Sequence, residues 1–323
     1  GLWEKGPISY LLKELGLDKE ELFVKNKVSF IYKNKQIDAN SLESFVKALV
    51  EISPGEENNI RAFFDEAVKA YEECYREAED YGTPLPAELI VKVYGSKKLL
   101  NYPREHPHFY KWLNRTYKQM LDEYFTSQDL KSVLCALLGY LGTSPEKTLA
   151  SSALTAVVSY YVHGGYYPRK GAQSFANALK QAIEKHGGVV LTSHKVDKIL
   201  VEDSEVKGVK ARGKVFKSPV VVANANAKTT FLELIDAKRL DEKFINYIKN
   251  LKMSPSVLIV SLGVDMNLSN YPTIIENLDD GYELIINSNA DPSLAPENKA
   301  SITITTLASY RDFPERGSRE YLE

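Results

Sequence analysis

The hydrophobic pattern of the chain changes near His163, and this change limits the fold more than any other feature. Up to about Tyr160, apolar residues recur every three or four positions, which is the spacing of amphipathic helices. Beyond Gly164-Gly165, short apolar or alternating runs follow one another between turns, as strands do. Helices followed by helix and strand units predict a mixed α/β fold, and 323 residues suffice for about two domains.

Composition excludes several classes of protein. With 44% hydrophobic and 26% charged residues the chain is neither disordered nor a membrane-spanning protein. A net charge of -2 provides no basic field for nucleic acid, so we expect no nucleic-acid partner. Cys74 and Cys135 lie on apolar helix faces without a CxxC pattern, which predicts buried thiols and no disulfide. These features, with no visible targeting segment, favour a cytoplasmic location.

The first stretch, residues 1–162, is predicted to be a helical cap with part of a substrate domain. Apolar residues at steps of three and four indicate amphipathic helices over residues 56–81 and 109–124. A third helix begins at Ser127 or Asp129, both of which are good N-caps, and ends near Gly139.

The middle stretch, residues 163–232, reads as helix, glycine stop and strands. A helix over residues 172–186 ends at Gly187-Gly188 and leads into an apolar run that predicts a strand. Further strands are predicted at residues 196–201, 206–211, 214–216 and 220–223. The first three of these form a small antiparallel meander that turns at Arg212-Gly213, and the last, being all apolar, is predicted to be buried on both faces.

The last stretch, residues 233–323, predicts an antiparallel sheet. Its strands are expected at residues 257–264, 282–286 and 301–307, and Asp279-Asp280-Gly281 is read as a hairpin turn rather than a carboxylate pair. Ile302 and Ile304 alternate with threonines, which leaves one face of the sheet available to solvent or ligand. A helix begins at Ser318.

No motif of a stand-alone enzyme occurs in the chain. HExxH, GxSxG, the P-loop and GxGxxG are all absent, and no catalytic residue is assigned. The two histidines of His106-Pro107-His108 could be a pair of metal ligands, but the proline favours an extended backbone at His106 and a third ligand is missing nearby. We therefore predict no metal site and read this segment as a loop or a helix start.

One long block carries a family resemblance. From Gly164 the chain reads Gly-Gly-Tyr-Tyr-Pro-Arg-Lys-Gly-Ala-Gln-Ser-Phe, then a helix, Gly187-Gly188, the meander and Val-Val-Ala-Asn-Ala. This order and spacing resembles the phytoene desaturase and carotenoid isomerase family of FAD-dependent oxidoreductases, a branch of the amine-oxidase-like flavoproteins. Similar segments occur at residues 11–17, at Pro54-Gly55-Glu56, at residues 139–142 before Pro145 and at residues 291–296.

The resemblance implies a partial FAD-binding Rossmann-type domain over residues 163–232, an antiparallel substrate-binding sheet and a helical cap. Family members begin with a strand, GxGxxG and a helix that hold the FAD pyrophosphate, and end with a second flavin segment. Neither is present here, so the chain is expected to be a central fragment, inactive by itself.

The resemblance also implies cofactor-binding residues. Val196 matches the position whose backbone meets the adenine edge, although a plain strand valine is an equal alternative. Ala223, Asn224 and Ala225 match a strand end close to the flavin. Pro168 and Gly171 match the loop that passes the isoalloxazine ring, where Lys170-Gly171 replaces the usual Gly-Gly.

The implied function is flavin-dependent oxidation or reduction of a long isoprenoid or carotenoid-like polyene, by desaturation, isomerisation or saturation. His163, Tyr166 and Tyr167 are the polar residues nearest the flavin loop and are candidates for substrate contact, a satisfied loop histidine being the alternative for His163. Two other functions stay open: a flavoenzyme acting on a soluble amine, and a non-catalytic interaction module that has lost the cofactor.

A lipophilic substrate suggests peripheral contact with a membrane. Leu2-Trp3 and the Phe63-Phe64 face are candidates for this contact, although the narrow apolar stripe of this helix favours core packing for the phenylalanines.

Overall fold

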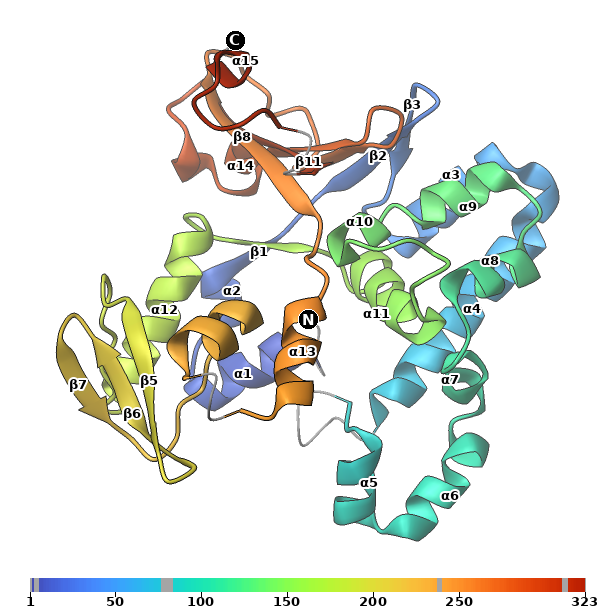
Figure 1. The fold of residues 1–323 in the computed structure, drawn as a ribbon. Coiled ribbons are helices and arrows are strands. Elements are labelled where there is room, and N and C mark those ends of the chain that lie inside the picture. Colours follow the sequence, from blue (N-terminus) through green and yellow to red (C-terminus); the bar gives the residue numbers. More distant parts are fainter. Residues whose placement is uncertain (1, 3–5, 77–83, 237–239, 310–312, 323) are drawn as a thin grey trace. The chain divides into compact units, whose positions relative to one another are not determined.

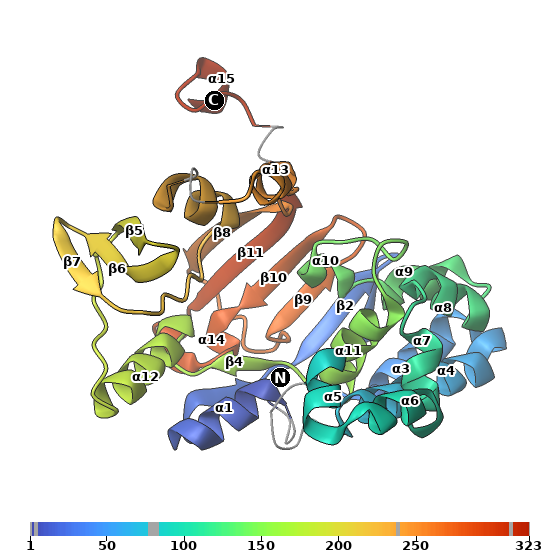
Figure 2. The same ribbon diagram turned by 60° about the horizontal axis from the view of Figure 1, so that its bottom comes forward.

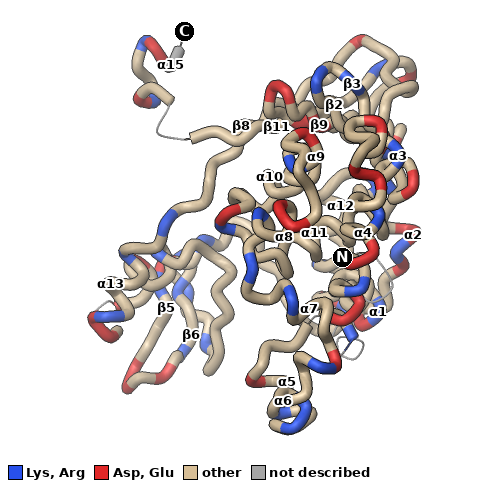
Figure 3. Tube along the Cα trace, turned by 90° about the vertical axis from the view of Figure 1, so that its right-hand side faces the viewer, with Lys and Arg blue, Asp and Glu red and all other residues tan. Residues whose placement is uncertain are grey.

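The computed structural model describes residues 2, 6–76, 84–236, 240–309 and 313–322. It divides into two compact units, residues 1–179 with 255–323, and residues 180–254 (Figure 1). Helices and sheets occur together, so the mixed α/β class predicted from the sequence is confirmed. Basic and acidic residues are interspersed along the chain (Figure 3).

Helices make up most of the first unit before residue 162. They are α1 (Pro7–Leu15), α2 (Lys19–Leu22), α3 (Leu42–Ile52), α4 (Glu57–Cys74), α5 (Ala87–Tyr94), α6 (Ser96–Glu105), α7 (Pro107–Trp112), α8 (Tyr117–Tyr124), α9 (Gln128–Leu134), α10 (Leu138–Leu141) and α11 (Ala150–Tyr161). A 3-10 turn, Pro54–Glu56, precedes α4. After residue 162 come α12 (Ala172–Lys185), which continues into the second unit, α14 (Asn287–Ala290) and α15 (Arg319–Leu322). None of the described helices is long and apolar enough to span a membrane.

The helical core is built on the apolar stripe of α4. Ile60, Phe63, Phe64 and Ala67 are buried there and pack with residues of α3, α7, α8 and α11. Full burial of one such phenylalanine contributes about 2–3 kcal/mol. The core packing preferred for Phe63 and Phe64 is therefore confirmed, and these rings are not available to a membrane. Trp3 lies outside the described residues.

The predicted helix over residues 109–124 is two helices, α7 and α8. Thr116 separates them because its extended backbone caps α8, with the Thr116 hydroxyl and the Gln119 side chain in a reciprocal capping box. Ser127 caps α9 as predicted.

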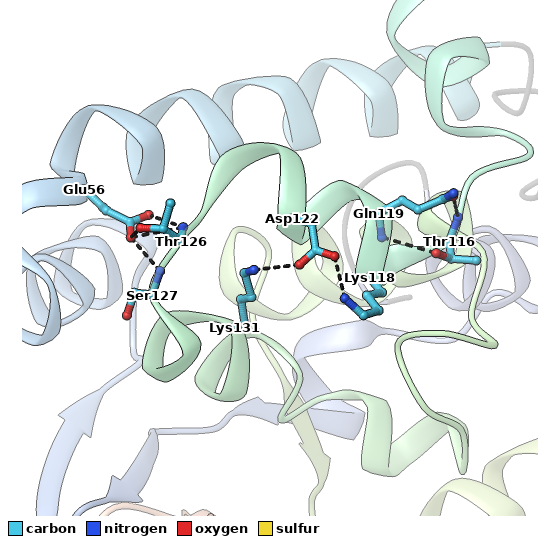
Figure 4. Close-up of polar contacts among 8 residues, drawn as sticks. All are labelled: Glu56, Thr116, Lys118, Gln119, Asp122, Thr126, Ser127 and Lys131. Carbon is cyan, nitrogen blue, oxygen red and sulfur yellow. Dashed lines mark hydrogen bonds and ion pairs between the residues drawn. The ribbon is translucent and has the colours of Figure 1, made fainter.

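Beside that cap, the buried Glu56 carboxylate accepts hydrogen bonds from Thr126 and Ser127 (Figure 4).

The first unit contains a six-stranded sheet in the order β3-β2-β9-β10-β11-β8. Its strands are β2 (Val28–Tyr32), β3 (Lys35–Asp38), β8 (Ser256–Val264), β9 (Ile274–Asn277), β10 (Tyr282–Ile286) and β11 (Ala300–Ala308). The predicted strands of the last third, and the hairpin turn at residues 279–281, are confirmed. The expectation of helix alone before residue 160 is wrong at β1 (Phe23–Lys25), β2 and β3, because β2 is stabilised by parallel pairing with the distant β9.

The two ends of this sheet differ in their surroundings. Phe30, Ile37 and Ile274 bury one face of β2, β3 and β9 against the helical core. In Figure 2 helices α8 to α11 lie at the β2 end, and β11 and β8 extend away from them. At the far edge β8 is open, and Ile259 is 61% exposed. One face of the sheet thus passes from a packed core to an accessible surface.

The second unit contains the predicted meander. Its strands β5 (Val196–Glu202), β6 (Glu205–Ala211) and β7 (Lys214–Lys217) pair in sequence, and the turn at Arg212-Gly213 has both residues at positive φ, as a type I′ hairpin requires. The helix α13 (Glu242–Asn250) follows, and the π-helical turn Thr229–Leu234 contacts it through Phe231 and Phe244. The helix α12 ends before Gly187, as predicted, and Gly187 has a φ of 80°.

Two strands predicted in the second unit do not form. Residues 189–191 and 220–223 are irregular, and the Val222 side chain is 90% exposed. Within the described part of this unit, every strand pairing belongs to the meander, so these apolar runs have no neighbouring strand to bond with. The predictions of strands here are wrong for that reason. The functional roles predicted for residues 1–162, 163–232 and 233–323 stay predictions.

Candidate functional site

A cavity of about 390 Å³ lies in the first unit beside the Gly164-Gly165 turn. Ten residues line it: Leu2, Ile8, Leu137, Tyr140, Ala156, Ser159, Tyr160, Gly164, Gly165 and Tyr166. Most of these side chains are apolar or aromatic, and the tyrosine and serine hydroxyls are its main polar groups. Ligand sites in proteins commonly combine such an apolar wall with a few polar groups.

The C-terminal part of α11 forms one wall of this cavity. That helix carries Ala156, Ser159 and Tyr160, and the backbone then turns at Gly164, whose φ is 94°. A Cβ on Gly165 would lie 3.2 Å from the Tyr160 ring, so glycine allows the chain to pass closely. The strand β4 (Tyr166–Pro168) follows and pairs with β1, placing Tyr166 opposite Lys25.

Three polar residues meet where α10 approaches the sheet. Glu276 on β9 is the direct cross-strand partner of Glu283 on β10. The Tyr140 hydroxyl donates to Glu276 Oε1 at 2.8 Å and also contacts the Glu283 carboxylate. The next strand adds Thr305, which donates to Glu283 Oε1 at 3.2 Å. We call Tyr140, Glu276, Glu283 and Thr305 the polar row. Because Tyr140 also lines the cavity, the polar row connects the cavity to the sheet.

Burial sets the protonation of this row. The Glu276 side chain is only 7% exposed, and burial raises its pKa to about 8, with the Glu283 charge adding to the rise and the Tyr140 hydrogen bond opposing it. Burial raises the pKa of the Tyr160 hydroxyl. The Tyr140 residue is 57% exposed, but its hydroxyl end is desolvated against Glu276 and Glu283, which raises its pKa as well, so both hydroxyls stay protonated. At neutral pH Glu276 holds a proton next to a second carboxyl group.

Buried hydroxyl groups surround the row. Tyr160 and Tyr161 of α11 have buried hydroxyls that lack a hydrogen-bond partner among the described residues. Tyr161 is 1% exposed, and Glu276 is the charge that acts most strongly on its hydroxyl. Buried donors without partners are rare in folded proteins and call for an explanation.

The predicted substrate residues lie around the same turn. Tyr166 lines the cavity, Tyr167 pairs with Val24 on β1, and burial raises the Tyr167 pKa. The His163 ring lies 5.6 Å from that of Tyr71, and burial lowers the His163 pKa, which favours a neutral imidazole. These positions are compatible with a packed loop histidine as well as with substrate contact.

Two predicted cofactor residues also belong to the first unit. Pro168 pairs with Phe23, and Gly171 has a φ of 87°, a conformation that favours glycine. The Lys170 amide between them donates to Asp291 Oδ2 at 2.6 Å, so the segment at residues 291–296 supports this loop. A Cβ on Gly171 would make only ordinary contact with Leu294, at 3.9 Å, so the backbone conformation rather than space requires glycine.

The other predicted cofactor residues belong to the second unit. Val196 begins β5, the edge strand of the meander, opposite Ala211 and next to a register irregularity. Ala223, Asn224 and Ala225 are exposed in irregular backbone before the π-helical turn. The structure thus places four of these residues in one unit and Pro168 and Gly171 in the other.

Neither histidines nor cysteines form a metal site in the described ranges, where no group of three potential ligands occurs. Pro107 begins α7 directly after His106, which confirms the reading of this segment as a helix start. His108 contacts Glu66 at 2.7 Å instead. Cys74 and Cys135 do not form a disulfide with each other, and burial raises the Cys135 pKa to about 12.

Sequence reasoning missed Tyr140, Glu276 and Glu283. The signal that points to them is a glutamate within each of two apolar strands, Ile274–Asn277 and Tyr282–Ile286. A carboxylate in such a strand is unexpected unless it has a partner.

Comparison with known proteins identifies a protein family that the chain matches. A model described as flavin containing amine oxidoreductase matches residues 3–319. Zebrafish (Danio rerio) all-trans-retinol 13,14-reductase is 26% identical over 72% of this chain and 39% of its own length. A 4,4'-diapophytoene desaturase of Methylomonas is 26% identical over 57% of this chain and 40% of its own. Prolycopene isomerase 1 of an Oncidium hybrid is 24% identical over 87% and 49%.

Solved structures are similar in fold. An oxidoreductase from Methanosarcina mazei matches 95% of this chain and 65% of its own with a TM-score of 0.66 and 15% identity. A putrescine oxidase variant matches 96% of this chain and 64% of its own with a TM-score of 0.57 and 12% identity. The chain spans about half or less of the length of the curated relatives that it matches.

Proposed function

The chain belongs to the flavin containing amine oxidoreductase family, and we propose that the protein containing it uses FAD to oxidise or reduce a long isoprenoid or carotenoid-like polyene. The observation that carries this proposal is the cavity beside Gly164-Gly165, whose wall is mostly apolar. Burial of apolar surface is the main force available for binding a hydrocarbon chain. The names of the three curated relatives, a retinoid reductase, a desaturase and a carotenoid isomerase, support the same class of substrate.

The cofactor would contribute the redox chemistry, because a bound flavin accepts or donates a hydride. The described residues fit part of such a group. The strand β5 lies at a sheet edge, where backbone N–H and C=O groups next to Val196 are available to an adenine ring. Ala223 and Ala225 are exposed and small, and the Gly171 turn presents backbone rather than a side chain.

The phosphate-binding part of the cofactor site is not within these 323 residues, since GxGxxG does not occur in them. We therefore assign residues 163–232 to one portion of a flavin domain. Residues 1–162 supply the helical cap and part of the substrate domain, and residues 233–323 supply the substrate sheet. By itself this chain would be inactive, because it lacks the loop that binds the pyrophosphate.

A soluble amine is the second candidate substrate, and one observation favours it. The Tyr140 hydroxyl contacts the carboxyl groups of Glu276 and Glu283, and negative charge there would attract an ammonium group. Against this, burial favours the neutral form of Glu276, and the cavity wall offers apolar contact. The polyene remains the better fit.

Contact with a membrane surface would give access to such a substrate. The helices α5 and α6 expose Leu89, Val91, Val93, Tyr94 and Leu100. Their basic residues Lys92, Lys97, Lys98 and Arg104 outnumber the acidic Glu88 and Glu105 (Figure 3). Apolar side chains next to positive charge are suited to an anionic bilayer surface, and we assign peripheral contact to this pair of helices.

The proposal is tested on the full-length protein that contains this chain. We expect flavin absorption bands in the purified protein and a change in those bands on adding a polyene such as lycopene in detergent micelles. Putrescine is the comparison ligand. A spectrum without flavin bands would support a non-catalytic interaction module, and a response to putrescine alone would support an amine oxidase.

A further inference from the structure

The direct pairing of Glu276 with Glu283 on neighbouring strands is energetically unfavourable unless another interaction compensates for it. Each is the other's direct cross-strand partner on the same face, and two like charges in this position repel. Glu276 is almost fully buried, where an isolated carboxylate is costly. One proton shared between the two groups removes both penalties.

The two ends of this row of cross-strand partners differ in burial. Its cross-strand partners run from Phe30 on β2 through Glu276, Glu283 and Thr305 to Ile259 on β8. Phe30 is fully buried and Ile259 is exposed, so the carboxyl pair lies where the packed core gives way to the open half of the sheet. Glu283 is only half-buried.

Tyr140 connects this pair to the cavity. It comes from α10, its hydroxyl contacts both carboxyl groups, and it is one of the residues that line the cavity. Its ring lies 6.2 Å from the ring of Tyr160, which lines the same cavity. A group bound in the cavity would meet Tyr140 before it met either glutamate.

We propose that Glu276 and Glu283 hold one proton between them and that Tyr140 transfers it to or from a substrate bound in the cavity. The proposal rests on the proposed function for the identity of the substrate. Tyr140 is the group exposed to the substrate, and the two glutamates act through it as positioning residues. Nothing in the family resemblance assigned a role to any of these three residues.

The atoms and electrons of the step balance in a desaturation. A bound flavin would supply the hydride acceptor, so the substrate would lose a hydride from one carbon and a proton from the neighbouring carbon. The electron pair of that second C–H bond becomes the new double bond. The proton passes to the Tyr140 oxygen while the Tyr140 proton passes to the ionised carboxylate, so Tyr140 ends neutral and the pair gains one proton. A saturation runs the same transfer in reverse.

The groups that act on the Glu276 carboxyl come from three elements. They are Glu283 of β10, Tyr140 of α10, and Tyr160 and Tyr161 of α11. The tyrosine hydroxyls stay neutral across the physiological range, so the group of this row that titrates there is the Glu276 carboxyl, opposite Glu283.

The first test is an infrared titration of the full-length holoenzyme without substrate. We expect a protonated-carboxyl band that disappears near pH 8 and that is lost in Glu276→Gln. Glu43→Gln, at an exposed position on α3, is the matched control and should leave the band unchanged. Absence of such a band in the unsubstituted protein would overturn the proposal.

The second test uses Tyr140→Phe, which keeps the ring and removes the hydroxyl. We expect kcat with the polyene to fall by roughly 10²–10⁴-fold, the usual contribution of a positioned acid or base, with KM and the flavin spectrum unchanged. An unchanged kcat would refute proton transfer through Tyr140. If the unsubstituted holoenzyme shows the carboxyl titration but no response to a polyene, the proposed function fails while the shared proton stands.

Discussion

Glu276 and Glu283 face each other across β9 and β10, and the hydroxyl of Tyr140 reaches both carboxyl groups. Neither glutamate is paired with a lysine or arginine in the described ion pairs. Their mutual repulsion and the burial of Glu276 therefore act together, and both favour a bound proton. This relationship makes the stability of the first unit sensitive to pH.

The first prediction concerns that sensitivity. The Glu276 pKa rises from its ordinary value of 4.5 to about 8 on folding, so the native state binds more protons than the unfolded state between these values. Its stabilising contribution is complete below pH 4.5 and is lost as the pH rises through 8. Between pH 5 and 8 we expect unfolding free energy to fall with a slope of at most about 1.4 kcal/mol per pH unit from this group.

Urea unfolding of the protein and of Glu276→Gln at several pH values measures this slope. The glutamine variant should show a flatter dependence, because its side chain does not titrate. Glu43→Gln should keep the original slope. Parallel curves for Glu276→Gln and the unsubstituted protein would contradict the prediction.

The second prediction concerns Glu56, which joins the start of α4 to the start of α9. Burial alone would raise its pKa, but the hydrogen bonds from Thr126 and Ser127 prevail and lower it. Glu56→Ala leaves those donors without an acceptor, and we expect a loss of about 2–3 kcal/mol in the free energy of unfolding. Since the folded pKa is lowered, the contribution is present above the ordinary pKa and is lost as the pH falls through the folded value.

The matched control is Glu57→Ala, one residue away. Glu57 forms an exposed i,i+4 pair with Arg61, and the loss should stay below about 1 kcal/mol. Equal urea midpoints for the two variants would show that the Glu56 hydrogen bonds do not stabilise the fold.

The third prediction compares two glycines of the meander. A Cβ on Gly208 would lie 2.0 Å from the Phe216 carbonyl oxygen, so Gly208→Ala must disrupt the pairing of β6 with β7. We expect a loss above about 3 kcal/mol, the range for a severe core or backbone conflict. Gly213 has a φ of 78° with open space around it, and Gly213→Ala should cost only about 1–2 kcal/mol.

Thermal unfolding followed by circular dichroism distinguishes the two variants. Similar melting temperatures for Gly208→Ala and Gly213→Ala would mean that β6 and β7 are not held as closely as the structure shows.

The fourth prediction concerns α5 and α6. If these helices contact an anionic bilayer, Lys92→Glu should weaken binding to phosphatidylserine vesicles by at least about fivefold, since each basic residue near such a surface contributes about 1 kcal/mol. Lys47→Glu, at an exposed position of α3, makes the same charge change elsewhere. Co-sedimentation with vesicles is the measurement, and equal effects of the two variants would exclude this pair of helices as the contact.

Local patterns predicted much of the structure correctly. The meander of β5, β6 and β7 is defined by short alternating runs and the Arg212-Gly213 turn, all within neighbouring residues. The hairpin at residues 279–281 and the end of α12 are similarly local. Such signals are readable because strand alternation, turn glycines and helix stops depend on nearby residues.

The incorrect predictions share a cause. The strand β2 exists because β9 pairs with it in parallel, and β9 lies far along the chain. Conversely, the apolar run at residues 220–223 has the pattern of a buried strand but has no partner in the described part of its unit. Whether an apolar segment becomes a strand is decided by what can bond with it.

The fold class, the family resemblance and the position of the turn at Gly164-Gly165 could be predicted, because they follow from local pattern and residue order. The chemistry of the cavity could not, because it depends on contacts that form on folding. Glu276 is an ordinary acidic residue in the sequence, and its raised pKa arises because folding buries it opposite Glu283 and beneath Tyr140. A glutamate within an apolar strand indicates that a partner is needed, but burial and the proximity of charges arise only in the folded chain, so residue order does not identify that partner.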